Sequence, residues 1–193
     1  MQSFSGARPV VIRPFCQDDT PLLHDAIRES IQQLGEWMTW CSPDHSISHT
    51  KSFIHKSAQA WERAEEYCFA IIDAKERILM GGVSLNQISR AHNFANLEYW
   101  VRSSRTGSGI ASAATLLAVE FGLEDLGYNR LELLIPNGNI PSKRVAQKVG
   151  AKFEGVLRNR LFLRGQPRDA LMYSVVRGDA DDRDLADTAP IRE

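Results

Sequence analysis

The sequence predicts an α/β domain built on a mixed β-sheet with helices on both faces. The first observation is the order of the segments, β, α, α, β, β, β, α, β, α, β, β, read from apolar β-rich runs and helical periodicities. The second is the joining of some neighbouring strands by short turns and others by helices, which gives both antiparallel and parallel pairs. A chain of 193 residues with 43% hydrophobic residues is long enough to bury one core.

Bulk properties exclude several classes of protein. The formal net charge of −1 gives no reason to expect a nucleic acid or an anionic membrane as partner. No apolar run approaches the roughly 20 residues that span a bilayer, and the N-terminus lacks the pattern of a signal peptide. The three cysteines, an odd number at unrelated spacings, are typical of reduced thiols. We therefore expect a cytoplasmic protein.

The first half of the chain predicts one strand, two helices and a hairpin. Thr20 and Pro21 form a helix-start signal, and apolar residues then recur at helical spacing up to Leu34. Ser48 is the expected cap of the second helix, and the paired glycines Gly81 and Gly82 indicate a bulge or a close backbone approach. The expected ranges are a strand at 9–15, a helix at 21–34, a loop at 35–49, and strands at 67–73 and 78–87.

The second half predicts two further strand–helix units and a closing hairpin. A strand over 94–101 leads into a helix from Ile110, a strand over 130–135 leads into a helix from Asn139, and Gly150 ends that helix. Strands over 151–160 and 168–177 close the domain. We expect residues 1–177 to form a single domain, and the acidic, polar segment 178–193 to be a disordered tail.

The turn at 106–111, Thr-Gly-Ser-Gly-Ile-Ala, carries the clearest chemistry. Its glycines let the chain turn tightly and let a ligand approach the backbone. The helix that follows offers free N–H groups and about half a positive charge at its start. This glycine turn, as we call residues 106–111, therefore predicts binding of an anion, most often a phosphate.

These features resemble the GNAT N-acetyltransferase superfamily, across roughly residues 9–177. A strand, a Q/R-x-x-G-x-G/A turn and a helix form the superfamily's signature for the pyrophosphate of acyl-CoA. Several fragments are similar to the RimJ/RimL branch, which acetylates α-amino groups of ribosomal proteins. They are Glu98-Tyr99-Trp100-Val101, Asn139-x-x-Ser142, Val145-Ala146, Val149-Gly150-Ala151, Phe153-Glu154-Gly155, Arg168-Asp169-Ala170 and Met172-Tyr173-Ser174.

The resemblance implies a GNAT fold with a sheet of six to seven strands, acetyl-CoA as cofactor and a set of binding residues. The glycine turn is expected to hold the diphosphate, and the strand before it to pair with the pantetheine arm where the sheet opens. Thr106 stands where the superfamily has Gln or Arg, so Arg102 or Arg105 is expected to supply the charge. The expected cofactor-binding residues are Tyr99, Trp100, Val101, Arg102, Arg105, Thr106, Gly107, Ser108, Gly109, Ile110, Ala111, Asn139 and Ser142.

The candidate catalytic residues are Glu98, Ser142 and Glu154. Glu98 replaces the glycine usual in the RimJ/RimL branch, and a carboxylate there is the first candidate for the base that accepts the amine proton. The alternative role for Glu98 is an ion pair with a nearby arginine. Glu154 matches a carboxylate credited with the base role in RimL-type enzymes, and Ser142 matches their acid. Ser142 as a first-turn hydroxyl that binds backbone, and thiolate release without any dedicated acid, remain open.

Glu36, Trp37 and Trp40 lie where relatives build the acceptor pocket, and are the candidate substrate contacts. Packing of the two tryptophans in the core or a lid is the alternative. Three histidines, His45, His49 and His55, have spacings like those of metal ligands, but no cysteine or carboxylate completes a set. We expect them to be solvated, and we expect no metal.

The predicted function is transfer of an acetyl group from acetyl-CoA to a primary amine, by direct attack in a ternary complex. The acceptor is a protein N-terminus or a small-molecule amine, and the chain is a monomer or a homodimer. The first alternative is a sensor of the same fold that binds acyl-CoA without turnover. The second is a nucleotide-dependent oxidoreductase, disfavoured because the glycine turn lacks the third glycine of a dinucleotide fingerprint.

Overall fold

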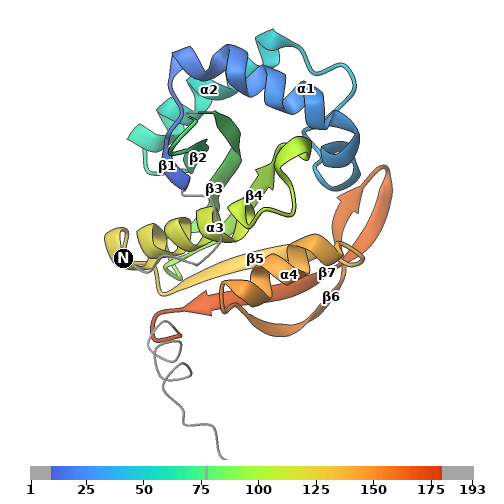
Figure 1. The fold of residues 1–193 in the computed structure, drawn as a ribbon. Coiled ribbons are helices and arrows are strands. Elements are labelled where there is room, and N and C mark those ends of the chain that lie inside the picture. The colour runs from blue at the N-terminus through green and yellow to red at the C-terminus, as the bar shows by residue number, and fades with distance from the viewer. Residues whose placement is uncertain (1–9, 77, 180–193) are drawn as a thin grey trace, which may run out of the picture.

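The computed structural model describes residues 10–76 and 78–179, which form a seven-stranded mixed sheet with four α-helices (Figure 1). The strands lie in the order β1-β2-β3-β4-β5-β7-β6. The strands are β1 (Val10–Pro14), β2 (Tyr67–Asp73), β3 (Leu79–Ser89), β4 (Phe94–Val101), β5 (Arg130–Pro136), β6 (Lys152–Leu163) and β7 (Gln166–Val176). The α-helices are α1 (Thr20–Trp37), α2 (Ile47–Glu62), α3 (Ile110–Glu120) and α4 (Ile140–Lys148).

One pair of strands divides the sheet into two halves. β1 to β4 pair antiparallel, as do β5, β7 and β6, whereas β4 and β5 are parallel. The parallel ladder is short, because only Phe94–Asn96 of β4 pair with residues 130–132 of β5. Beyond Asn96 the two strands part, as the resemblance implied. The expected mixed sheet is therefore confirmed, and it is split at its centre.

Helices cover both faces of the sheet, as predicted. On one face α3 and α4 pack on alternate apolar residues of the strands, including Leu97, Leu131 and Leu133, and form the larger core. On the other face α1 and α2 cover only the β1–β3 side (Figure 1), with Leu23, Ile54 and neighbouring side chains in a second core. The β4–β5 split lies beside this second layer of helices.

The loop between the first two helices is shorter than predicted. α1 continues through Glu36 and ends at Trp37, and α2 starts at Ile47, which leaves residues 38–46 as the connection. The cap is Ser46 rather than the predicted Ser48: the Ser46 hydroxyl accepts a hydrogen bond from the His49 N–H, and His49 Nδ1 accepts one from the Ser46 N–H. This reciprocal pairing satisfies backbone N–H groups at the start of α2. The spacing of apolar residues, from which the helix was predicted, does not indicate which serine makes it.

Two further expectations concern the bulge and the end of the domain. Ile71 pairs with Gly81 and Ile72 with Leu79, so Met80 is the extra residue of a bulge next to the paired glycines, as predicted. The predicted tail lies outside the described residues from 180 onward, while Gly178 and Asp179 form a turn. No helix within the described ranges is both long enough and apolar enough to cross a membrane.

Candidate active site

The glycine turn joins β4 to α3 through a short 3₁₀ turn, η2 (Ser103–Arg105). Gly107 and Gly109 have φ angles of 75° and 81°, in the left-handed region that glycine occupies without a steric penalty. Gly109 is the N-cap of α3 and has no side chain to satisfy the amides of the first turn. Amides left free at the positive end of a helix dipole are the arrangement that favours binding of an anion.

The polar side chains of the turn bind its own backbone. The Thr106 hydroxyl donates to the carbonyl of Ser103 at 3.0 Å, and the Ser108 hydroxyl donates to the carbonyl of Arg105 at 2.6 Å. Thr106 therefore stabilises the turn, whereas a longer Gln or Arg at this position extends toward a ligand. Anion binding here depends mainly on backbone N–H groups.

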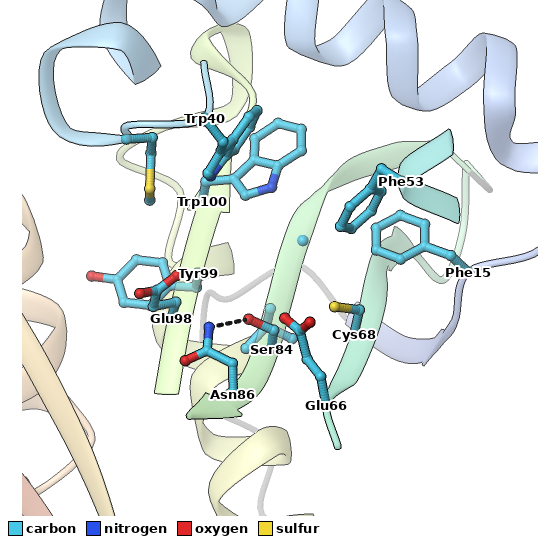
Figure 2. Close-up of a pocket in the computed structure, with 13 residues that line it drawn as sticks. Phe15, Trp40, Phe53, Glu66, Cys68, Ser84, Asn86, Glu98, Tyr99 and Trp100 are labelled. Carbon is cyan, nitrogen blue, oxygen red and sulfur yellow. Dashed lines mark hydrogen bonds between the residues drawn. The ribbon is translucent and has the colours of Figure 1, made fainter. Parts of the chain in front are cut away.

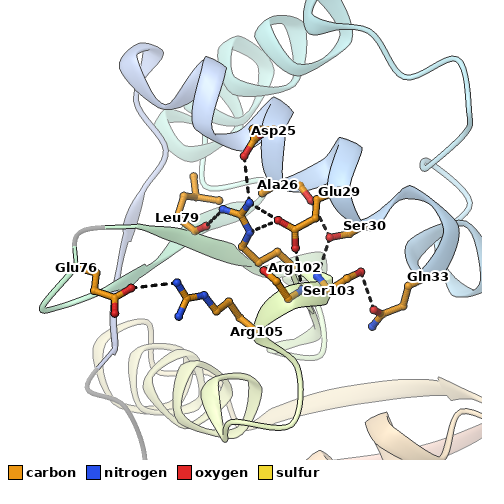
Figure 3. A network of polar contacts seen from close by, with 11 residues as sticks. Asp25, Ala26, Glu29, Ser30, Gln33, Glu76, Leu79, Arg102, Ser103 and Arg105 are labelled. Atoms are coloured by element: carbon orange, nitrogen blue, oxygen red, sulfur yellow. Dashed lines mark hydrogen bonds and ion pairs between the residues drawn. The ribbon is translucent and has the colours of Figure 1, made fainter.

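Arg102 anchors the turn to α1 instead of pointing into it (Figure 3). Its guanidinium binds Glu29 and Asp25 and donates to the Leu79 carbonyl at 3.3 Å. The Ser104 N–H donates to the second Glu29 oxygen at 2.8 Å. The hydrogen bond from Arg102 is the main reason that the pKa of Glu29 falls to about 2. The Arg102 guanidinium is therefore held by α1, and the expectation that Arg102 or Arg105 supplies charge to the turn stays a prediction.

Arg105, the other arginine expected to supply charge, pairs with Glu76 at 3.1 Å. Both groups are partly exposed, with side-chain exposures of 27% and 44%, and such pairs are weak. A weakly held guanidinium at the surface is able to turn toward a bound anion. Of the two arginines, Arg105 is the one that the geometry leaves available.

Tyr99 lies at the split between β4 and β5, on the face that α4 covers. Its hydroxyl is buried and lacks a hydrogen-bond partner among the described residues. Burial raises the pKa of this phenol to about 12, and the close approach of the Ser142 hydroxyl, which falls short of hydrogen-bond geometry here, has the opposite effect. Buried polar groups are nearly always paired in native proteins, so an unpaired phenol at a gap in the sheet fits a bound ligand there.

Asn139 and Ser142 begin α4 next to this split. The Asn139 side chain accepts a hydrogen bond from the Ser142 N–H at 3.1 Å, so Asn139 is the N-cap, as one of its two expected roles requires. Because this bond uses only the Asn139 oxygen, its amide nitrogen remains available for a ligand. Ser142 is half-buried and lies beside the Tyr99 phenol.

A pocket opens on the other face of the sheet, under the 38–46 loop and α2 (Figure 2). Phe15 and Phe53 lie together on one side, with ring centroids 5.5 Å apart, and Trp40 and Trp100 lie together across from them, 6.1 Å apart. We name it the aromatic pocket. It is lined by Phe15, Met38, Trp40, Phe53, Glu66, Cys68, Gly82, Val83, Ser84, Asn86, Glu98, Tyr99 and Trp100.

Strand register sets the floor of the aromatic pocket. Residues that pair across β2, β3 and β4 share one face, so Cys68, Ser84 and Glu98 form one row. The next row toward the aromatic side is Ala70, Gly82 and Trp100. A Cβ on Gly82 would lie 2.9 Å from Trp100 Nε1, so the glycine is needed for the indole to lie over the sheet.

Glu98 projects into this pocket, and no ion pair holds it among the described residues. The carboxylate is exposed, and its one hydrogen bond is to the side-chain amide of Asn96, at 3.2 Å from Oε1. Burial, together with the charges of Glu66 and Glu98, raises the pKa of the Cys68 thiol far above its usual range. Cys68 is therefore an uncharged part of the pocket wall near neutral pH.

Glu154 has the opposite surroundings. Arg130 binds both of its oxygens, at 2.6 Å for the Nη1–Oε1 contact, and the Ser174 hydroxyl donates to Oε1 at 2.6 Å. The hydrogen bond from Arg130 is the largest cause that lowers the pKa of Glu154 to about 2, and Ser174 adds to it. The arginine ion pair considered for Glu98 is thus found at Glu154, and an arginine-bound carboxylate is a poor proton acceptor.

Comparison with known proteins identifies the family to which this fold belongs. Residues 10–152 match the model of the acetyltransferase (GNAT) domain. The chain belongs to the GNAT acetyltransferase family.

Relatives of this acetyltransferase align over most of its length. YdaF of Bacillus subtilis is 25% identical over 175 residues, which cover 87% of this chain and 91% of YdaF. The ribosomal-protein-serine acetyltransferase of Escherichia coli is 25% identical over 152 residues, 79% of this chain and 84% of that one. The structure of Mycobacterium smegmatis RimJ, solved with a CoA-disulfide, superposes with a TM-score of 0.82 at 24% identity, and covers 92% of this chain and 89% of RimJ.

The family assignment confirms the expected fold and enzyme class, and it removes the oxidoreductase alternative. The protein is an acetyl-CoA-dependent N-acetyltransferase with RimJ/RimL-type relatives.

Only one of the three candidate substrate contacts lines the aromatic pocket of this acetyltransferase. Trp40 is in the 38–46 loop and lines the pocket, whereas Glu36 and Trp37 are in α1 and do not. The difference arises because α1 continues three residues beyond its predicted end. A helix directs successive side chains about 100° apart, so these two residues point away from the direction that the loop gives to Trp40.

One of the three histidines packs differently from the prediction, whereas His49 and His55 are exposed, as predicted. His45 is 9% exposed rather than solvated, and its Nε2 lies 2.9 Å from the Thr50 hydroxyl. Burial and the neighbouring charges of His24, His49 and Arg28 lower the pKa of His45. Among residues 10–76 and 78–179, no group of three or more His, Cys, Asp or Glu side chains has the arrangement of a metal site.

Several pocket residues were missed at the sequence level. Phe15 and Phe53 come from β1's end and from α2, and Glu66 directly precedes β2. Asn96 was also missed, although the alternation Asn96, Glu98, Trp100 along one strand places all three on one face. That alternation is the one signal that would have indicated Asn96, because the other residues converge only through strand register and helix packing.

Proposed function

We propose that this acetyltransferase moves the acetyl group of acetyl-CoA to a primary amine by direct attack in a ternary complex, with Glu98 as the base. The observation that carries this proposal is the Glu98 carboxylate, which projects without an ion pair into a pocket that adjoins the split in the sheet. Among the three catalytic candidates it is the carboxylate placed to accept a proton from an amine.

The two substrates approach from opposite sides of the split. The amides of the glycine turn hold the diphosphate of acetyl-CoA, and Arg105 adds charge from the surface. The free edge of β4 from Tyr99 to Val101 pairs with the pantetheine arm, since β5 no longer occupies that edge. The unpaired Tyr99 phenol and the free amide nitrogen of Asn139 fit this arm, because both are donors without another acceptor at the split.

The chemistry assigned to the chain's own residues is proton transfer and stabilisation of charge. The amine loses its proton to Glu98, directly or through one water, and its lone pair then forms the new bond to the thioester carbon. A backbone N–H of β4 near Tyr99 polarises the carbonyl oxygen. As the C–S bond breaks, the sulfur leaves as a thiolate that accepts a hydrogen bond from the Ser142 hydroxyl, and the proton lost by the new amide nitrogen passes to this thiolate directly or through that hydroxyl.

The lining of the aromatic pocket favours cationic or apolar amines as acceptors. The described residues that line it include the carboxylates of Glu66 and Glu98 and no lysine, arginine or histidine. Aromatic faces attract cations and apolar groups alike. We propose that the acceptor presents an uncharged or positively charged body behind its amine. The E. coli relative named above acts on a ribosomal protein serine, so a protein N-terminus belongs in the test.

Isothermal titration with acetyl-CoA tests the cofactor site. Gly109→Val should abolish binding, because valine at a φ of 81° strains the turn and fills the site with a side chain. Gly165→Val is the matched control. Gly165 has a φ of 73° in the β6–β7 turn, and no heavy atom lies within 4 Å of the position that a Cβ would take, so its replacement should leave binding unchanged. Wild-type protein that binds no acetyl-CoA would refute the proposal.

Thiol release from acetyl-CoA tests turnover with a panel of acceptors. The panel contains spermidine, 2-phenylethylamine, glutamate and a peptide with a free N-terminal serine. We expect the cationic and apolar amines to react and glutamate, which carries two carboxylates, to be rejected. Tight binding of acetyl-CoA without turnover of any amine would favour the sensor alternative instead.

A further inference from the structure

Asn96 lies at the point where the sheet divides. It is the last residue of β4 that pairs with β5, where it is in register with Glu132, and on its other side it pairs with Asn86 of β3. The side chain is 2% exposed. Its position beneath Glu98 on the same face of β4 makes it a buried polar group directly under the proposed base.

Only one orientation of the Asn96 amide gives each of its hydrogen bonds a donor and an acceptor. Its Nδ2 donates to Asn86 Oδ1 at 2.8 Å and to Glu98 Oε1 at 3.2 Å. An ionised carboxylate only accepts hydrogen bonds, so the group that faces Glu98 must be the NH₂ of Asn96. That orientation in turn requires the oxygen of Asn86 to face Asn96, and Asn86 Nδ2 then donates to the Ser84 hydroxyl at 3.3 Å.

The other end of the Asn96 amide is unsatisfied. Its Oδ1 is buried and has no hydrogen-bond partner among the described residues. A buried acceptor without a partner is destabilising, and an apolar side chain of similar size would avoid that cost. The unsatisfied oxygen offsets part of what the hydrogen bond to Asn86 contributes, and the amide also directs a donor at Glu98, which an apolar side chain would not do.

We propose that Asn96 is a positioning residue for the acetyl-transfer reaction: it holds Glu98 Oε1 and leaves Oε2 directed to the amine. This inference rests on the proposed role of Glu98 as base. One charge-assisted hydrogen bond fixes the carboxylate in one rotamer, and the Asn86–Ser84 chain fixes Asn96. A base held in place transfers a proton faster than one that samples several rotamers.

The pH at which Glu98 takes up a proton also depends on the other titratable groups around it. Glu66 and Cys68 face it from the β2 side, Tyr99 is its neighbour on β4, and Glu132 lies across from Asn96 on β5. The thiol and the phenol are uncharged near neutral pH. The other charges are the carboxylates of Glu66 and Glu132, the latter paired with Arg130 at 2.8 Å.

Two replacements of Asn96 separate positioning from packing. Asn96→Leu removes the donor and the unsatisfied oxygen, so we expect an unchanged or higher melting temperature with a kcat about tenfold lower. Asn96→Asp keeps the shape but places a carboxylate beside Glu98, which favours the protonated form of that pair. The acid limb of the rate profile should then move up by about one pH unit, with an unchanged KM for acetyl-CoA.

Thr115→Val is the control, because Thr115 is a fully buried residue of α3 whose hydroxyl also has no partner in the described part of the chain, and it lies outside the site. It should alter neither kcat nor the pH profile. Rates use the fastest amine of the panel above, and ¹³C NMR of the Glu98 carboxyl, assigned with Glu98→Gln, gives its titration midpoint without turnover.

The NMR measurement keeps the two proposals separate. A midpoint that does not rise in Asn96→Asp, or an Asn96→Leu enzyme with kcat within twofold of wild type, would overturn the positioning role. If Glu98→Gln retains the wild-type rate, the proposed base is wrong, whatever the midpoint shows.

Discussion

The two halves of the sheet each carry a glutamate that the sequence offers as a base, and their surroundings differ completely. In the β1–β4 half, Glu98 projects into the aromatic pocket and is held by one neutral amide. In the β5–β7 half, Glu154 is bound at both oxygens by Arg130 and by the Ser174 hydroxyl. Two residues of the same type are therefore suited to different roles, catalytic or structural, because different groups hydrogen-bond to their carboxylate oxygens.

The largest expected effect comes from neutralising the free carboxylate. Glu98→Gln keeps the size of the side chain but removes its ability to accept a proton. We expect kcat to fall by about 10²-fold or more at neutral pH, while the affinity for acetyl-CoA in isothermal titration stays within twofold. A kcat within a few-fold of wild type would show that Glu98 is not the base, in spite of its lack of an ion pair among the described residues.

Glu154→Gln is the counterpart in the other half of the sheet and serves as the control for Glu98→Gln. Because Arg130 and Ser174 already occupy the oxygens of Glu154, we expect kcat to change by no more than about twofold. Steady-state rates of both variants with the same amine check this expectation. A large loss of rate in Glu154→Gln alone would reverse the assignment of the two glutamates.

A smaller effect is expected from the wall of the aromatic pocket. Trp40→Ala removes the indole that faces Trp100 at 6.1 Å, so contact area for the acceptor is lost while Glu98 stays in place. We predict a KM for the amine raised by about tenfold and a kcat reduced much less. Trp37→Ala, at the end of α1 and outside the pocket, is the matched control, and an equal effect of both variants would contradict the structure.

The smallest effect is the acid sensitivity of the ion-paired carboxylates. The pKa of Glu154 falls from about 4.5 to about 2 on folding, so its contribution to stability is present above pH 4.5 and is lost as the pH falls toward 2. Glu29, paired with Arg102, behaves alike. Urea unfolding at several pH values should show a steeper loss of stability over this window in wild type than in Glu154→Gln. Equal slopes would indicate that the exposed Arg130 pair contributes nothing measurable.

Elements with strong local signals were predicted well. The amphipathic helices, the glycine turn and the closing hairpin follow from hydrophobic period and from glycine, proline and cap residues, all of which act within a few positions along the chain. The end of α1 was missed because Gly35 and the aromatic residues after it weaken the helical pattern. The helix nevertheless continues three residues further, to Trp37.

The site was predicted unevenly, for the same physical reason. The glycine turn acts through its backbone, and the sequence motif specifies that backbone directly. The partners of side chains are not specified in this way. Arg102 or Arg105 was expected to supply charge to the turn, and no sequence pattern indicated that α1 brings Asp25 and Glu29 to the Arg102 guanidinium across more than 70 positions in the chain. Long-range pairs of this kind leave no local pattern.

The sequence by itself determined the family, the mixed α/β fold, the anion-binding turn and a short set of catalytic candidates, because motifs and periodicities are local. Only the tertiary structure decided how those candidates differ. Strand register places Asn86 and Ser84 beside Asn96 and Glu98, the short β4–β5 ladder opens the sheet at Tyr99, and the β5–β7 pairing brings Arg130 and Ser174 to Glu154. The charge and freedom of a carboxylate depend on its neighbours in space, and folding alone brings those neighbours together.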